Sequence, residues 1–81
     1  AQLARAAGAL VAVDNTWATP ILTRPLALGA HVVMHSTTKY LGGHSDVMGG
    51  ALVFARRADF HRRVFHRRHV TGGILAPFSA W

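Results

Sequence analysis

Two short apolar runs, each followed by polar residues, constrain the fold of this 81-residue chain more than any other feature. The first spans residues 9–13 (ALVAV) and is followed by Asp14, and the second spans residues 31–35 (HVVMH) and is followed by Ser36. A continuous apolar run of this length is typical of a strand buried on both faces, as in a parallel sheet covered by helices. Because a helix-forming stretch precedes the first run, the sequence predicts half of a βαβ unit and therefore an α/β fold.

The remaining elements are predicted from helix and turn signals. Residues 1–7 are rich in Ala, Leu and Arg, which favour helix, and Gly8 follows as a C-terminal cap. Proline and glycine positions set the other boundaries. We expect a loop over residues 17–23, a short helix over residues 25–28 closed by Gly29, a third strand over residues 47–54 and a helix over residues 58–69.

Length and composition limit the classes of protein to which this chain can belong. Eighty-one residues allow one small domain, and a domain of this size has marginal stability. The chain has no cysteine, and no apolar run approaches the ~20 residues that span a bilayer, so we expect a cytoplasmic protein without a membrane partner. It does not begin with Met, and it ends in an apolar stretch, so we expect a partial domain over residues 1–81, truncated at both ends.

The only lysine of the chain lies in the loop that follows the second apolar run. Ser36 and Thr38 precede Lys39 at alternate positions, so their hydroxyls would share a face of an extended segment. Pyridoxal phosphate needs an amine for a Schiff base, a carboxylate beside its ring nitrogen and donors for its phosphate. Lys39, Asp14 and the two hydroxyls provide these groups, but the groups alone leave this cofactor as one option among several.

Three motifs, in a fixed order along the chain, narrow these options to one protein family. They are residues 13–20 (VDNTWATP), residues 25–30 (PLALGA) and residues 35–47 (HSTTKYLGGHSDV), and a further match follows at residues 77–81 (PFSAW). Together they closely resemble the cystathionine γ-synthase/γ-lyase family, the pyridoxal-phosphate enzymes of cysteine and methionine metabolism. The resemblance covers nearly the whole chain and is weaker over residues 56–69.

The resemblance implies a fold and a chemistry. The fold is the cofactor-binding large domain of a fold-type I pyridoxal-phosphate enzyme, with a mostly parallel sheet flanked by helices. Lys39 would bind pyridoxal 5′-phosphate covalently and move protons, Asp14 would pair with the ring nitrogen, and Ser36 and Thr38 would hold the phosphate. The reaction would be elimination or replacement on sulfur amino acids or homoserine esters, of the cystathionine γ-synthase, γ-lyase, β-lyase or O-acyl-homoserine sulfhydrylase type.

Other parts of the family site do not fall within this sequence. The tyrosine that stacks on the cofactor lies upstream in family members, and the arginine that grips the substrate carboxylate lies downstream. A further tyrosine and arginine come from a neighbouring subunit, and the resemblance implies a homotetramer for the full-length form. We therefore expect the 81-residue chain to be inactive by itself.

The predicted helix over residues 58–69 is the basis of the main alternative function. Its apolar stripe contains Phe60 and Val64, with Phe65 and His69 at the border. Six arginines lie between positions 56 and 68 and give the chain much of its net charge of +6, which suggests a non-catalytic basic module for nucleic acid. The arginine pairs spread around the helix, and the spacing places no aromatic platform among them, so a solvated face with only nonspecific affinity is expected. Of the helix histidines, only His66 and His69 share a face, so no metal site is expected.

Overall fold

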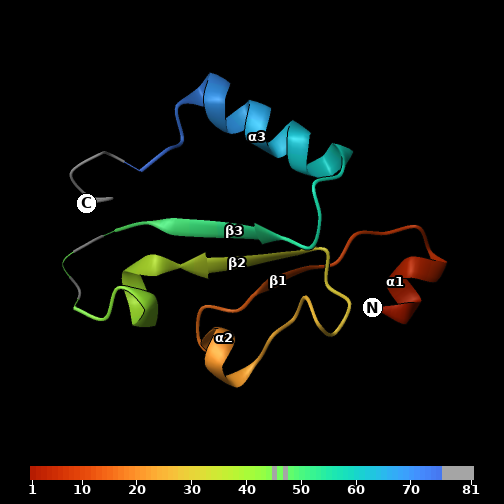
Figure 1. Cartoon of the computed structure of the whole chain (residues 1–81), viewed down its shortest axis with the longest axis horizontal. Helices are drawn as coiled ribbons and strands as arrows, with labels where there is room; N and C mark the ends of the chain where they lie inside the picture. The colour runs from red at the N-terminus through yellow and green to blue at the C-terminus, as the bar shows by residue number, and fades with distance from the viewer. Residues whose placement is uncertain (45, 47, 76–81) are drawn as a thin grey trace.

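The computed structural model describes residues 1–44, 46 and 48–75. Residue 47, where the third strand was predicted to begin, and the motif at residues 77–81 lie outside the described residues. Three strands form one sheet in the order β1-β2-β3, with helices before, between and after them (Figure 1). The elements are α1 (Gln2–Ala6), β1 (Ala12–Asp14), α2 (Thr19–Leu22), β2 (Val32–Ser36), the kinked helical turn η1 (Thr37–Leu41), β3 (Gly50–Phe54) and α3 (Asp59–Thr71).

The two predicted apolar strands pair in parallel. Ala12 is opposite Val32, and Asp14 is opposite Met34, so the carboxyl ends of β1 and β2 lie at the same edge of the sheet. β1 is shorter than predicted, and the prediction that it is buried on both faces is wrong, because Ala12 and Asp14 are exposed. Within the described residues β1 pairs with β2 alone, so its other edge has no neighbouring strand there.

β3 runs antiparallel to β2, which makes the described sheet mixed. Val33 is opposite Val53, and Ser36 is opposite Gly50. The described residues between β2 and β3 contain only the short turn η1 and no long crossover helix, and a short return of this kind places the next strand antiparallel. The apolar pattern of β3 specified a strand but not its direction.

The segment between β1 and β2 differs from its prediction in two places. The expected loop over residues 17–23 contains the short helix α2, with Pro20 in its first turn, where the missing N–H of proline costs nothing. The expected helix over residues 25–28 is instead a run of turns, in which the N–H groups of Ala27 and Leu28 each donate to a carbonyl three residues earlier. Gly29, which was predicted to close that helix, instead closes these turns with φ +100°, a conformation that glycine adopts without steric cost.

Helix α3 matches its prediction closely in extent. It ends at Gly72, which has φ +75° and donates its N–H to the carbonyl of Arg68, as a left-handed cap does. The predicted border of the apolar stripe is wrong, because Phe65 is 52% exposed and His69 is exposed. His61 is half-buried instead, with its ring 4.8 Å from that of Phe54 on β3. In Figure 1, α3 lies beside β3, on the opposite side of the sheet from α2.

The hydrophobic core of the described residues is small. Its buried apolar residues are Ala30, Val32 and Val33, whereas 16 large hydrophobic residues are exposed. The radius of gyration is 14.1 Å, compared with about 12 Å for a compact chain of this length. An arrangement this open buries little apolar surface, so the paired strand ends are held mainly by hydrogen bonds.

Candidate functional site

The predicted site residues gather at the edge where the two parallel strands end. Asp14 is the last residue of β1 and Ser36 is the last residue of β2. Lys39 follows three residues later, in the turn η1. The crevice beyond the carboxyl ends of parallel strands is where α/β proteins commonly bind ligands. The sequence placed these three residues correctly relative to the strand ends.

A hydroxyl that sequence reasoning missed joins Asp14 to Ser36. The Thr16 hydroxyl donates to Asp14 Oδ1 at 2.6 Å and accepts the backbone N–H of Ser36 at 2.9 Å. The Thr16 N–H also donates to Asp14 Oδ1, at 3.1 Å. Thr16 is 8% exposed, whereas Asp14 is exposed, so these bonds are partly buried. An Asp followed two residues later by a hydroxyl residue is the sequence signal of such a turn.

These hydrogen bonds set the charge state of Asp14. The Thr16 hydroxyl and N–H lower the pKa of the Asp14 carboxyl below its ordinary value of 3.8, and the nearby His35 lowers it further. Because folding lowers the pKa of Asp14, its ionised carboxylate stabilises the folded chain. This contribution to the free energy of unfolding is complete above the ordinary pKa and is lost as the pH falls through the lowered pKa of the folded state. The carboxyl group therefore remains an exposed anion at neutral pH.

We expect Thr16→Val to weaken the junction of β1 and β2. The substitution keeps the side-chain volume but leaves the Ser36 N–H without an acceptor, which costs about 1–3 kcal/mol of unfolding free energy. It should also raise the pKa of Asp14 toward its ordinary value. Urea unfolding and an NMR titration of Asp14 measure the two effects, and Thr16→Ser, which keeps the hydroxyl, serves as the control. An unchanged titration in Thr16→Val would refute this role.

The turn η1 presents Lys39 to solvent. Lys39 has φ −86° and ψ −124°, outside the helical region, and its carbonyl accepts the Gly43 N–H at 2.9 Å. A Cβ at Gly42 would lie 2.5 Å from the carbonyl oxygen of Thr37, so the turn can close this tightly only with glycine there. Trp17 and Tyr40 meet edge to face beside the lysine, with ring centroids 6.1 Å apart.

The two predicted phosphate-binding hydroxyls are in different situations. The expectation that they share a face of an extended segment is wrong, because the chain turns helical at Thr37. The Thr38 hydroxyl contacts the backbone of Gly49, accepting its N–H at 3.0 Å and donating to its carbonyl at 3.4 Å. The Ser36 hydroxyl forms no hydrogen bond among the described residues. In the loop that follows, His44 Nδ1 lies 3.1 Å from the Gly42 carbonyl oxygen.

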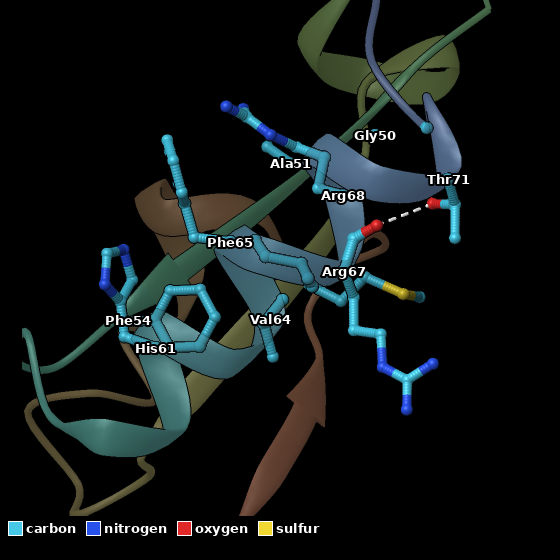
Figure 2. A pocket seen from close by; sticks show the side chains of 12 residues that line it. Gly50, Ala51, Phe54, His61, Val64, Phe65, Arg67, Arg68 and Thr71 are labelled. Carbon is cyan, nitrogen blue, oxygen red and sulfur yellow. Dashed lines mark hydrogen bonds between the residues drawn. The ribbon is translucent and has the colours of Figure 1, made fainter.

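Two cavities lie on opposite faces of the sheet. One of about 700 Å³ lies between α3 and β3, and Figure 2 shows Phe54, His61 and Phe65 among the side chains around it. A second, of about 320 Å³, lies on the opposite face of β2 and is lined by the buried His35. None of the four predicted site residues lines either cavity.

Comparison with known proteins decides the family. Residues 1–81 match the family described as Cys/Met metabolism PLP-dependent enzymes, where PLP is pyridoxal phosphate. The chain belongs to this family. Over its 81 residues it is 48% identical to cystathionine gamma-lyase of Bacillus subtilis (strain 168), with 100% of this chain and 21% of the relative covered. It therefore spans about a fifth of the length of that relative.

Solved structures place the fold in the same family. A cystathionine gamma-lyase from Lactobacillus plantarum, complexed with L-serine, superposes with a TM-score of 0.93 at 42% identity, covering 99% of this chain and 21% of that one. A cystathionine gamma synthase from Xanthomonas oryzae pv. oryzae, in complex with cystathionine, superposes with a TM-score of 0.90 at 46% identity, covering 98% and 20%. The chain is thus a segment of the fold-type I architecture that the resemblance implied.

The residues at the strand ends fit the family cofactor by their chemistry. Near one edge of the sheet lie an ionised carboxylate, a solvent-exposed amine and a serine hydroxyl that forms no hydrogen bond among the described residues. The described residues bring no group of three metal-ligating side chains together. None of the helices among them has the length and apolar character required to cross a bilayer.

Proposed function

We propose that residues 1–81 are part of the pyridoxal-phosphate-binding domain of a trans-sulfuration enzyme. The observation that supports this most is the shared sheet edge, where Thr16 holds Asp14 against the end of β2 and Lys39 follows in a glycine-closed turn. The family match over the whole chain supports the same conclusion. The complete enzyme would act on sulfur amino acids or homoserine esters by elimination or replacement.

Each site residue would have a separate role. When bound, pyridoxal phosphate acts as an electron sink for carbanions formed on amino-acid substrates. Lys39 Nζ would hold the cofactor covalently and, once displaced by the substrate amine, would move protons between substrate carbons. Asp14 would keep the ring nitrogen protonated because its own carboxyl is ionised. Ser36 would donate to the phosphate, and Thr38 would do so while keeping its bond to the Gly49 N–H.

The proposed substrate class follows from the relatives. The Lactobacillus enzyme was solved with L-serine, and the Xanthomonas enzyme with cystathionine. Both compounds are small amino acids, and they support an amino-acid substrate for the complete protein. We also propose that the complete protein is a cytoplasmic homotetramer, an inference that rests on the family resemblance.

A segment exchange tests this function. The 81 matched residues of the Bacillus subtilis cystathionine gamma-lyase, which are 48% identical, are replaced by this chain. The hybrid is expected to bind pyridoxal phosphate and to release a keto acid and a thiol from cystathionine. The same hybrid with Lys39→Ala should release neither and serves as the control. A folded hybrid that does not take up the cofactor would contradict the proposal.

A further inference from the structure

Helix α3 and the three residues before it, 56–58, carry most of the positive charge of the chain. Six arginines lie between positions 56 and 68, and Asp59 is the only acidic residue among them. The whole sequence holds three carboxylates against nine Lys and Arg residues, so internal ion pairs can neutralise at most a third of this charge. All eight arginines and the single lysine are exposed. Arginine binds phosphate with two parallel hydrogen bonds, which lysine cannot do.

A groove of about 730 Å³ runs along one side of α3 and is lined by some of these basic side chains. Members of the groove recur four residues apart along the helix, at 61, 65 and 69 and at 62 and 66, so they form one continuous stripe. Basic and imidazole side chains surround a single phenyl ring in it. The lining residues are Arg57, His61, Arg62, Phe65, His66 and His69.

The ring of Phe65 lies between this groove and the cavity under α3. Phe65 lines both spaces, whereas Arg68 lines only the cavity, and its guanidinium lies 4.5 Å from the ring centroid. Figure 2 shows both side chains projecting from α3. The guanidinium therefore covers one face of the ring, the ring of His61 lies 6.3 Å away at a tilt of 35°, and Phe65 as a whole residue is 52% exposed. The expectation that no aromatic platform lies among the arginines is wrong for this helix.

We propose that this groove binds single-stranded nucleic acid. An unpaired base would stack on the exposed part of the Phe65 ring, and the phosphates on either side of the base would bind Arg57 and Arg62. A duplex hides its base faces within the stack, so it could use the arginines but not the ring. A mononucleotide offers the same base and phosphate with fewer contacts. This proposal is independent of the cofactor function, because no predicted site residue lines the groove.

Fluorescence anisotropy of a labelled 12-nucleotide single strand with the 81-residue chain tests the proposal. Phe65→Leu keeps an apolar side chain and should weaken binding about tenfold, since loss of base stacking typically has that effect or more. Arg57→Gln/Arg62→Gln should lower the slope of log affinity against log salt by about 1.4, or about 0.7 for each lost phosphate contact. Arg5→Gln/Arg63→Gln removes the same charge outside the groove and should leave the slope nearly unchanged.

Competitors separate the possible sources of binding. An unlabelled single strand should displace the probe at lower concentration than a duplex of the same length or a mononucleotide. Circular dichroism on every variant shows whether α3 is retained. Equal losses in the two double variants, whether the chain is folded or unfolded, would mean nonspecific attraction to a polycation and would overturn the proposal. Equal competition by the duplex, or no effect of Phe65→Leu, would overturn it as well.

Discussion

Lys39→Arg is expected to abolish borohydride-stable labelling of the chain by pyridoxal phosphate, apart from the labelling of the N-terminal amine. Lys39 is the only lysine in the sequence, and arginine stays protonated, so it keeps the positive charge but cannot attack an aldehyde. The turn that presents Lys39 is closed by Gly42, and the substitution leaves that closure intact. The expected loss is therefore chemical and not a consequence of unfolding.

The measurement is reduction with borohydride followed by peptide mapping in a mass spectrometer. In the unmodified chain, labelling of Lys39 should saturate at a cofactor concentration at which the Ala1 amine is still sparsely labelled. The N-terminal amine is the internal control in both chains. Labelling of Lys39 that never exceeds that of Ala1 would show that the isolated segment forms no cofactor site. The segment exchange would then remain the test of the enzyme itself.

Asp14→Asn is expected to lower turnover of the hybrid enzyme by about 10- to 1,000-fold. A carboxylate within a few ångströms raises the pKa of a cationic partner by about 1–3 units, so its loss should deprotonate the cofactor ring nitrogen to that extent. Asn keeps the side-chain size and can still accept the Thr16 hydrogen bonds. The effect therefore reports the charge and not the packing.

The pH dependence and a matched variant check this role. Because the pKa of Asp14 is lowered from 3.8, its carboxyl stays ionised throughout neutral pH, and the unsubstituted hybrid should show no acid limb from this group near neutrality. Asp59→Asn removes the same charge at the start of α3 and should change turnover little. An Asp14→Asn hybrid with unchanged turnover and an unchanged pH profile would rule out the ring-nitrogen pairing.

The sequence predicted the fold best for the two apolar strands and for the polar residues that follow each of them along the chain. The runs at residues 9–13 and 31–35 located two parallel strands within a few residues, and their polar ends located Asp14 and Ser36 at one edge. Local rules failed in the connections. Pro20 and Pro25 both permit a helix start, and the helix forms at the first, because turns ending at Gly29 direct the chain into β2.

The sequence by itself determined the family, the parallel strand pair and the position of the lysine, because these depend on residue order and on local apolar pattern. The tertiary structure alone decided two other features: the antiparallel direction of β3 and the Thr16 hydroxyl that joins Asp14 to Ser36. Each of these depends on which groups meet across elements distant in sequence. Spacing along one strand or one helix carries no information about the partner on the next.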